Sequence, residues 1–342
     1  NFFKDVINAN SAFVWVAGTI AAGDYVLTGG VAGTPTLGEL QTAFGIFVNA
    51  ELYDISLVLA GKAKPEVANF IIDNVVSIRK DCMVLISPEI VGVGTTDAYD
   101  GDIVLPTTAT KTEKLIAYRN AITASGVEGG ASHAAMDSGF KYQYDRYNDV
   151  YRWVPMNGDI AVLCARTDAT NDAWWSPAGL NRGAIKNIVR LAFNPNQTER
   201  DELYKNGINP VVSLPGQGTV LFGDKTLLAK PSAFDRINVR RLFIVLEKAI
   251  AIAAKYQLFE FNDSFTRAQF KGIVEPFLRD VQGRRGIIDF RCVCDETNNT
   301  GEVIDSNQFV ADIYIKPARS INFITLTFVA ARTAVSFEEI GA

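Results

Sequence analysis

The stretch that decides the fold is ISLVLAGKAKPEVANFIIDNVVSIRKDCMVLIS, residues 55–87. It begins with a short apolar run at 55–60 and ends with another at 83–87, and both runs are rich in β-branched and aliphatic residues, as buried strands are. Between them, apolar residues recur every three or four positions, as on one side of a helix: Val67, Phe70, Ile71, Val75 and Ile78. Pro65 suits the first turn of such a helix. A strand, a helix and a second strand predict neighbouring parallel strands.

The same alternation extends to both sides of this stretch. A further strand is predicted at 13–17, and helices are predicted at 37–49 and 111–124. The tyrosine-rich segment GFKYQYDRYNDVYRW predicts a hairpin that turns around Asp145 to Asp149. We therefore expect an α/β domain over residues 1–194, with a largely parallel sheet covered by helices on both faces.

The second part of the chain has a different pattern. After the strand-like segment 184–193, NPNQTE at 194–199 interrupts the pattern, so a domain boundary is placed there and a second domain spans 195–342. Its predicted helices are 198–206, 238–256 and 263–281, the last with a possible kink at Pro276, and its predicted strands are 209–214, 219–223, 287–294, 309–315 and 321–330. This order predicts an α+β domain with a mostly antiparallel sheet.

Composition excludes several classes of protein. The 342 residues are 48% hydrophobic and 21% charged, which is typical of a globular protein. The formal net charge of -5 argues against binding to nucleic acid or to an anionic membrane by the chain as a whole. No apolar run reaches the roughly 20 residues that cross a bilayer, so no membrane insertion is expected. Four cysteines without a framework spacing suit a reducing compartment, and the start at Asn1 indicates a fragment of a longer protein.

Candidate catalytic residues are few. His133 is the single histidine, and the motifs HExxH and GxSxG are absent from the sequence. Cys292 and Cys294 lack the second pair that a zinc site needs, so a buried structural role is favoured. In the segment Gly218–Thr226, an aspartate precedes Lys225 where a phosphate loop would need backbone amides. No cofactor, metal or enzymatic activity is expected; a hydrolase or a nucleotide-binding enzyme would require His133 or Lys225 to take part.

Positive charge is concentrated in the second domain. Residues 236–285 contain ten Lys and Arg against five Asp and Glu. In the helix 238–256, Arg241, Lys248 and Lys255 recur every seven positions, away from the apolar stripe of Val239, Leu242, Leu246, Ile250 and Ala253. In the next helix, Arg267, Lys271, Glu275 and Arg279 recur every four. Two interpretations remain open: a solvated face, or a docking surface for an acidic partner.

Two further segments indicate architecture and assembly. WWSPAGLNRG contains Trp174, Trp175, Pro177, Gly179, Arg182 and Gly183, and without a base, metal cluster or phosphate loop it is interpreted as a structural corner. Arg182 is expected to meet an acidic neighbour, either within the subunit or in another copy.

The segment TAVSFEEI at 333–340 offers a short β-prone stretch, Val335, Ser336, Phe337 and Glu338. Such a strand either completes its own sheet or pairs with another chain.

Several segments in order resemble one known family, the contractile tail sheath proteins of T-even-type bacteriophages. They are GFKYQYDRYNDVYRWVP (139–155), LCARTD (163–168), SPAGLNRG (176–183), LYKNGINPV (203–211), VLFGDKT (220–226), FDRINVRRLF (234–243), LFEFNDSFTR (258–267), VCDETNNT (293–300) and IKPARSINFITLTFVA (315–330). The similarity is strongest after about residue 139, and residues 1–130 agree mainly in pattern.

The resemblance implies a non-enzymatic structural subunit, found in the tail of the virion and assembled in the host cytoplasm. Such subunits form six-fold rings stacked in a helical sheath around a tail tube, between a baseplate and a tail terminator protein. The resemblance further implies that terminal strands join neighbouring subunits, and that the C-terminal domain faces the tube. On charge, the tube-facing residues are expected to be Arg241, Lys248, Lys255, Arg267, Lys271 and Arg279. A related contractile machine, such as a tailocin or a secretion system, is the alternative.

Overall fold

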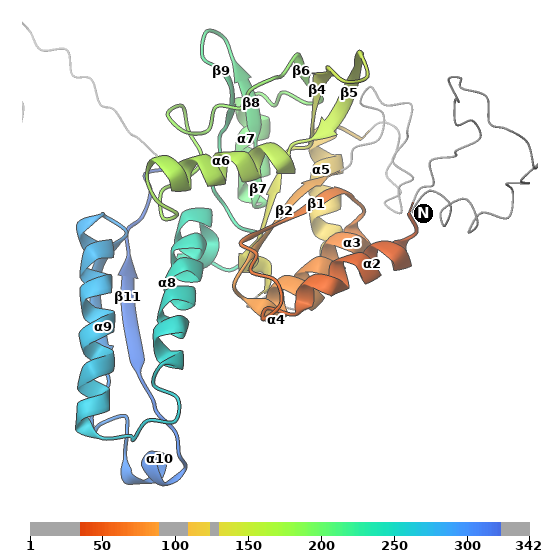
Figure 1. Ribbon diagram of the computed structural model, residues 1–342. Helices are drawn as coiled ribbons and strands as arrows, with labels where there is room; N and C mark the ends of the chain where they lie inside the picture. Colours follow the sequence, from red (N-terminus) through yellow and green to blue (C-terminus); the bar gives the residue numbers. More distant parts are fainter. Residues whose placement is uncertain (1–34, 89–108, 124–129, 323–342) are drawn as a thin grey trace, which may run out of the picture. The chain divides into compact units, whose positions relative to one another are not determined.

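The central feature of the fold is a sheet of four parallel strands in the order β1-β2-β3-β7 (Figure 1). It is seen in a computed structural model that describes residues 35–88, 109–123 and 130–322. The strands are β1 Leu57–Ala63, β2 Met83–Pro88, β3 Ala134–Asp137 and β7 Ile208–Asn209. All residues of β2 are buried, as expected for an inner strand covered on both faces. The predicted parallel sheet is confirmed; the predicted strand at 13–17 lies outside the described residues.

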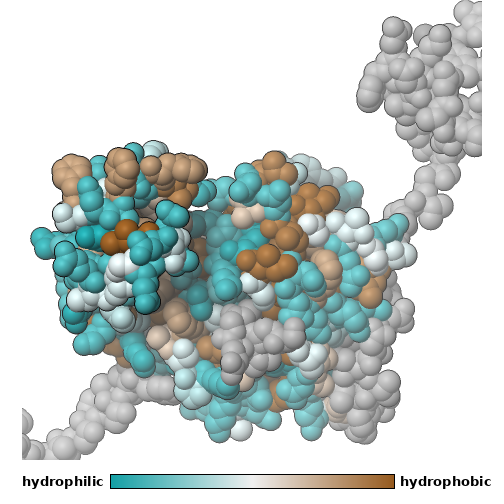
Figure 2. Space-filling model, turned by 90° about the horizontal axis from the view of Figure 1, so that it is seen from below, coloured by the Kyte–Doolittle hydropathy of each residue, from teal (hydrophilic) through white to brown (hydrophobic). Residues whose placement is uncertain are grey.

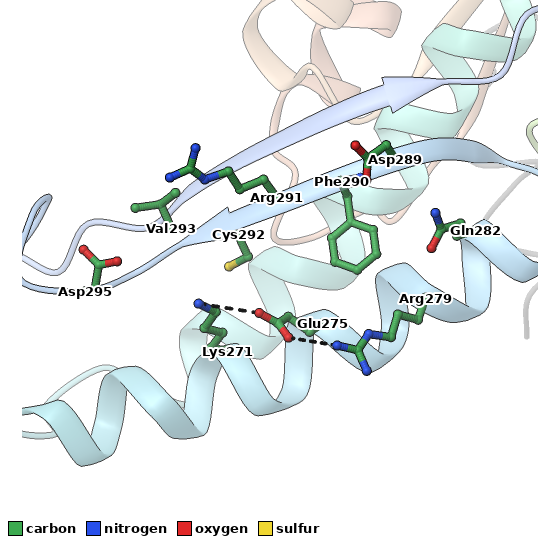
Figure 3. A pocket seen from close by; sticks show the side chains of 10 residues that line it. All are labelled: Lys271, Glu275, Arg279, Gln282, Asp289, Phe290, Arg291, Cys292, Val293 and Asp295. Carbon is green, nitrogen blue, oxygen red and sulfur yellow. Dashed lines mark hydrogen bonds and ion pairs between the residues drawn. The ribbon is translucent and has the colours of Figure 1, made fainter.

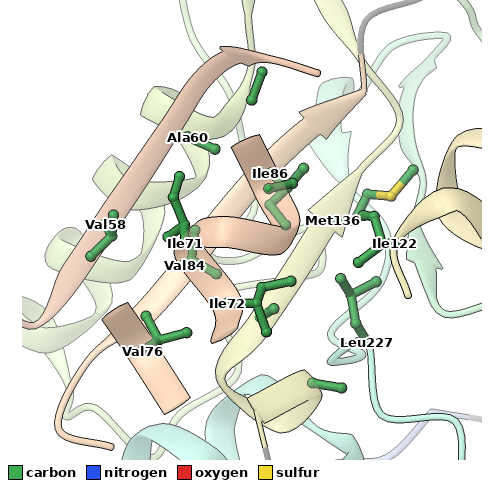
Figure 4. Close-up of a cluster of buried hydrophobic side chains, with 14 of the residues drawn as sticks. Val58, Ala60, Ile71, Ile72, Val76, Val84, Ile86, Ile122, Met136 and Leu227 are labelled. Carbon is green, nitrogen blue, oxygen red and sulfur yellow. The ribbon is translucent and has the colours of Figure 1, made fainter. Parts of the chain in front are cut away.

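One face of this sheet is covered by helices from the first part of the chain. They are α2 Leu37–Gly45, η1 Ile46–Val48, α3 Pro65–Phe70, η2 Ile71–Val76, α4 Ser77–Arg79 and α5 Lys111–Ala121. The predicted helix between the two strands, with Pro65 in its first turn, is present, but its middle segment, η2, is a π-helix. The wider π turn lets the adjacent pairs Ile71–Ile72 and Val75–Val76 all become buried. Figure 4 shows Ile71, Ile72 and Val76 beside sheet residues of the same hydrophobic cluster.

The opposite face is covered by α6 Asn157–Thr170 and by the first turns of α8 Ile237–Lys255. Met83, Leu85 and Ala135 of the sheet pack there in one cluster with Ile160 and Leu163 of α6. No element is predicted at 157–170, so α6 is a helix that the sequence pattern misses. Its buried positions include the polar residues Asn157 and Thr167, which weaken the apolar stripe by which a helix is recognised.

Two small antiparallel sheets complete this part. The predicted tyrosine-rich hairpin is formed by β4 Phe140–Asp145 and β5 Val150–Pro155, and β6 Arg190–Leu191 pairs with β4. Of the strand-like segment 184–193, only β6 and an isolated bridge at Ala184 have β pairing. The helix α7 Gln197–Lys205 begins with a capping box between Asn196 and Glu199. The second hairpin is β8 Val211–Leu214 and β9 Gly218–Leu221.

The last described elements pack two long helices against a two-stranded antiparallel ribbon (Figure 1). They are η4 Ala233–Asp235, α8, α9 Ser264–Gly283, β10 Ile287–Val293, α10 Gly301–Asp305 and β11 Asp312–Pro317. The expected α+β arrangement with antiparallel strands is confirmed. Pro276 lies inside α9 and does not end it. Most of the predicted strand at 321–330 lies outside the described residues.

The helix α8 carries buried side chains of two hydrophobic clusters. Ile237 and Ile244 pack in the cluster below the parallel sheet, whereas Leu242 and Leu246 pack with α9 and the β10–β11 ribbon. The predicted division between residues 194 and 195 does not coincide with a break in the sheet, because β7 lies beyond it and pairs with β3. The change from the parallel sheet to the helix-and-ribbon part falls along α8 instead.

Candidate interaction surfaces

The candidate catalytic residues have structural partners. His133 is buried, and its Nε2 lies 3.1 Å from the carbonyl oxygen of Lys80. Lys225 Nζ donates to the carbonyl of Tyr204 at 2.6 Å, and burial lowers the pKa of Lys225. Cys292 and Cys294 are buried, and burial raises the pKa of Cys294 to about 11, so the thiol stays protonated near neutral pH. Within the described residues, no group of three or more His, Cys, Asp and Glu side chains could hold a metal ion.

The two tryptophans of WWSPAGLNRG fix this segment to the helix-and-ribbon part. Trp174 is buried in the cluster of α9 and β10, and its Nε1 donates to the carbonyl of Arg284 at 3.1 Å. The guanidinium of Arg284 lies 5.2 Å from the Trp174 ring. Trp175 lies beside two further guanidinium groups, Arg182 at 5.0 Å and Arg285 at 5.6 Å from its ring centroid.

Glycine is required at two positions of the same segment. Gly179 has φ +92°, and its amide donates to the carbonyl of Leu221 in β9 at 2.9 Å. A Cβ on Gly183 would lie 2.7 Å from the carbonyl oxygen of Gly179 and 2.9 Å from that of Leu221. Arg182 meets no acidic partner among the described residues; its Nε donates to the carbonyl of Ser176 at 2.8 Å, before the buried Pro177. The segment is therefore a tight turn bonded to β9.

Next to this turn, the carboxylate of Asp224 joins four parts of the chain. Asp224 is only 3% exposed. Its oxygens accept hydrogen bonds from Ser176 of the turn at 3.0 Å and from Ser320 and Asn322 near the end of the described chain at 2.9 and 3.0 Å. Tyr204 of α7 and Arg236, before α8, also contact it at 3.4 and 3.5 Å. Asp224 thus holds the root of the C-terminal segment, residues 318–322, against the body of the subunit.

The basic residues of α8 differ in their surroundings. Arg241 is buried and forms an ion pair with Asp168 of α6. Lys248 Nζ donates to Asp54 Oδ1 at 2.7 Å and to the carbonyl of Ile55 at 2.9 Å, so it connects α8 to the segment before β1. Lys255 is exposed at the end of the helix. The expected common basic face is corrected for Arg241, because the side chain of Asp168 binds it inside the subunit.

The basic residues of α9 are also divided between interior and surface. Arg267 is buried and donates to Asn262 Oδ1 at 2.8 Å, so it is not part of an exposed basic face of the described chain. Lys271 and Arg279 flank Glu275 at 3.6 and 3.5 Å (Figure 3). These three residues form one wall of a groove of about 480 Å³ between α9 and β10. From β10, Phe290 and Cys292 point toward α9 (Figure 3).

A group of exposed hydrophobic residues, most of them aromatic, lies in the turn between α8 and α9 and in the first turn of α9, and it is not among the predicted sites. Its members are Tyr256, Leu258, Phe259, Phe261 and Phe265. Phe261 is 85% exposed, and Phe259, with φ +72°, is fully exposed. Figure 2 shows hydrophobic side chains gathered along one edge of the part formed by α8–α10. The run QLFEFNDSF could have signalled it, because phenylalanines that alternate with acidic and amide residues fit no buried helical stripe.

The expected inter-subunit strand, Val335, Ser336, Phe337 and Glu338, lies outside the described residues. In the part of the chain that the structure describes, no helix is long and apolar enough to cross a membrane.

A parallel sheet covered by helices, followed by two helices on an antiparallel ribbon, is the fold of contractile sheath proteins. The contracted helical sheath of the anti-feeding prophage matches with a TM-score of 0.65 and 16% identity, over 88% of this chain and 76% of that chain. The contracted PVC sheath of an extracellular contractile injection system matches with a TM-score of 0.64 and 17% identity, over 86% of this chain and 81% of that chain.

Sequence comparison gives the family within this class. The model of the phage tail sheath protein central domain matches residues 53–227, and that of the phage tail sheath C-terminal domain matches residues 229–331. The chain belongs to the phage tail sheath protein family. The tail sheath protein of Vibrio phage KVP40 is 45% identical over 93% of this chain and 48% of its own length. That of Enterobacteria phage T4 is 45% identical over 93% of this chain and 49% of its own length. The chain thus spans about half the length of the curated relatives it matches.

Proposed function

We propose that this chain is the C-terminal part of a contractile tail sheath subunit. Many copies assemble as six-fold rings stacked in a helical sheath around a tail tube, and contraction of the sheath drives the tube through the host envelope. The observation that supports this most strongly is that two consecutive sheath domains match residues 53–227 and 229–331, on a fold shared with contracted sheaths. The 45% identity to phage tail sheath proteins favours a phage tail over a tailocin or a secretion system.

The proposed role is structural and not enzymatic, with no cofactor. The proposed partners are other copies of the chain, the tail tube protein, the baseplate and the tail terminator protein, in the virion and, during assembly, in the host cytoplasm. Contraction then exchanges one set of contacts between subunits for a more stable set. A few kcal/mol gained per subunit, summed over many subunits, is sufficient for a mechanical stroke.

Of the six basic residues expected to face the tube, we retain three as proposed contacts with the tail tube. Lys255 is exposed, and Lys271 and Arg279 reach the surface beside Glu275. Arg241 and Arg267 are buried, and Lys248 is bound to Asp54, so their positive charge is used within the subunit. We place the start of the tube-facing domain near residue 229, where the second sheath model begins.

Strand exchange between subunits is the proposed connection. The ribbon β10–β11 has two strands among the described residues, and β10 pairs there only with β11. A strand formed by Val335, Ser336, Phe337 and Glu338 of a neighbouring subunit could pair with such an edge and lengthen the sheet. Backbone pairing of this kind would keep subunits joined while their other contacts change.

The test is assembly of the purified chain. Electron microscopy should show ordered tubes of the whole chain, and a chain that lacks residues 333–342 should remain folded, by circular dichroism, and form none. Amorphous particles from the whole chain would contradict the sheath proposal. Tubes of normal order from the truncated chain would contradict the proposed strand alone.

A further inference from the structure

A large cleft lies between the WWSPAGLNRG turn, α7 and the ends of β10 and β11. It encloses about 1150 Å³. Trp174 and Trp175 of the turn, Phe222 after β9 and Ile287 of β10 supply aromatic and aliphatic surface. The cleft is separate from the groove between α9 and β10, and the proposed function gives it no role.

Four arginines line this cleft: Arg182, Arg200, Arg285 and Arg319. Among the residues that the structure describes, none of the four forms a salt bridge, although other arginines of the same region do. Two carboxylates also line the cleft, but Asp224 already accepts hydrogen bonds from its neighbours, which leaves Asp201. With four arginines against two carboxylates, the cleft therefore carries an excess of positive charge.

Aromatic rings hold three of these arginines in place. Arg182 and Arg285 lie 5.0 and 5.6 Å from the ring centroid of Trp175, and Arg200 lies 5.8 Å from that of Phe222. A guanidinium that stacks on a ring keeps N–H groups available in its plane, where they suit a carboxylate. The chemistry of the cleft therefore suits an acidic segment that also has apolar side chains.

The chain contains such a segment beyond the described residues. Glu338 and Glu339 are adjacent, they are flanked by Phe337 and Ile340, and they are the only acidic residues after Asp312. Residues 323–342 lie outside the structure, and the chain enters them from the cleft itself, because Asn322 is one of its lining residues.

The direction of the ribbon connects this segment to the cleft. β10 begins and β11 ends at the cleft, where Ile287 pairs with Pro317. A strand that pairs with β10 in the antiparallel sense runs in the same direction as β11 and ends at the cleft. If residues 335–337 pair in this direction, Glu338 and Glu339 arrive beside Arg285 and Arg319.

A second copy is the better source of this segment. Ser320 and Asn322 hold the root of the subunit's own segment at Asp224. The predicted strand at 321–330 would carry the chain about 30 Å away from this root, at about 3.3 Å per residue. In an array of identical subunits, a tail that extends this far from its own cleft can reach a neighbour.

We propose that the arginine and tryptophan cleft binds the acidic segment Phe337–Ile340 of a second copy of the chain and so locks the exchanged strand in register. This inference rests on the proposed function, because it needs subunits that assemble. It adds a side-chain lock, with a defined strand direction, to the backbone pairing proposed above.

Charge reversal tests the proposal on the whole chain. The cleft variant Arg285→Glu/Arg319→Glu changes exposed side chains, and the tail variant is Glu338→Lys/Glu339→Lys. Each variant alone should raise the concentration at which tubes first form by at least about tenfold, the effect of about 1.4 kcal/mol from two partly exposed ion pairs. Pelleting and negative-stain microscopy measure that concentration. Arg146→Glu/Lys186→Glu, on exposed residues outside the cleft, is the matched control and should change it little.

Rescue identifies the occupant. A chain with all four reversals should assemble at the original concentration, and so should an equal mixture of the cleft variant with the tail variant, because each tail then meets a complementary cleft on another copy. Rescue by the four-fold variant but not by the mixture would show that each tail binds its own subunit and would overturn docking to a second copy. No rescue in either arm, or no effect of the cleft variant, would overturn the cleft as the site. Tubes of the unchanged chain keep the sheath proposal intact in each of these cases.

Discussion

The indole Nε1 of Trp174 donates a hydrogen bond to the carbonyl oxygen of Arg284, 3.1 Å away, and so joins the turn after α6 to the end of α9. This bond connects residues 110 positions apart in the sequence. Together with the burial of the Trp174 ring, it fixes the helix-and-ribbon part to the turn at WWSPAGLNRG.

Replacement of Trp174 by phenylalanine should lower the free energy of unfolding by about 1–2 kcal/mol. The variant loses the hydrogen bond and part of a buried ring, and it leaves the Arg284 carbonyl without this donor. Urea unfolding followed by circular dichroism measures the change. Trp175→Phe is the control: Trp175 is only partly buried against the same cluster and stacks with exposed or half-exposed arginines, so this change should cost less than about 1 kcal/mol. Equal losses in the two variants would refute the anchoring role of Trp174.

Alanine at Gly183 should destabilise the chain by about 2 kcal/mol or more. Its Cβ would lie 2.7 and 2.8 Å from backbone atoms of Gly179, and a backbone cannot move aside as a flexible side chain can. Gly272→Ala in α9 is the matched control, because nothing lies within 4 Å of its Cβ and alanine favours a helix by about 0.5–1 kcal/mol. Thermal unfolding should therefore shift in opposite directions in the two variants.

The exchange Asp224→Asn should expose the root of the C-terminal segment to protease. Ser320 and Asn322 donate to this carboxylate, and each hydrogen bond to a charged group contributes about 1.5–3 kcal/mol. We expect trypsin to cleave after Arg319 about ten times faster in the variant, through more frequent local opening. Mass spectrometry of the fragments measures the rate. Asp201→Asn, which alters the same cleft without these bonds, should leave it unchanged.

Stability should depend on the protonation of Asp137. Burial raises the pKa of this carboxyl from 3.8 to about 7, against the opposing effects of hydrogen bonds from Ser87 and Gly139. Because the folded state binds the proton more tightly, the stabilising contribution is full below about pH 4 and is lost as the pH rises to about 7. The loss is about 1.4 kcal/mol per pH unit between these values.

Asp137→Asn provides the comparison for this titration. The amide keeps one acceptor for the Gly139 amide but does not ionise. The free energy of unfolding of the unchanged chain, relative to that of Asp137→Asn, should therefore fall between pH 4 and 7 in urea titrations. A difference that is constant over this range would show that Asp137 does not titrate there.

Arg241 and Lys255, about four turns apart on the same expected basic face, should behave differently. Arg241→Met removes the ion-pair partner of Asp168 and should cost about 1–3 kcal/mol of stability, although the methionine keeps an apolar side chain at this buried position. Lys255→Glu changes an exposed residue and should stay within about 0.5 kcal/mol. In copelleting with tail tubes, Lys255→Glu should weaken binding while the unfolding free energy is retained. A clear loss of stability in Lys255→Glu would contradict the assignment of Lys255 to the exposed surface.

Periodicity predicts the elements in which apolar residues recur at a regular spacing. The strands at 57–63 and 83–88 and the long helices α8 and α9 lie where their apolar stripes indicate. It misses α6, whose buried face includes Asn157 and Thr167. It also misses the π turn at 71–76, because two apolar pairs four positions apart, Ile71–Ile72 and Val75–Val76, fit both an α and a π helix.

Charge spacing is a weaker guide than apolar spacing. The seven-residue repeat of Arg241, Lys248 and Lys255 describes one helix face, yet each of these residues meets a different environment: Asp168, Asp54 and solvent. Partners such as Asp54 come from segments almost 200 positions away, and no local pattern in α8 encodes them. The hydrogen bonds to Asp224 cannot be predicted from a local pattern for the same reason, since their donors come from four separate segments.

The shared burial of α8 also decides where mechanical work can be stored. One continuous helix contributes to the core beneath the parallel sheet and to the core of the ribbon, so bending the subunit there would open both cores at once. The part of the subunit from the parallel sheet to the β10–β11 ribbon should therefore move as one rigid body. Elastic strain during any rearrangement of an array would then fall on junctions between copies and on the short tether at Ser320 and Asn322, and not within the subunit.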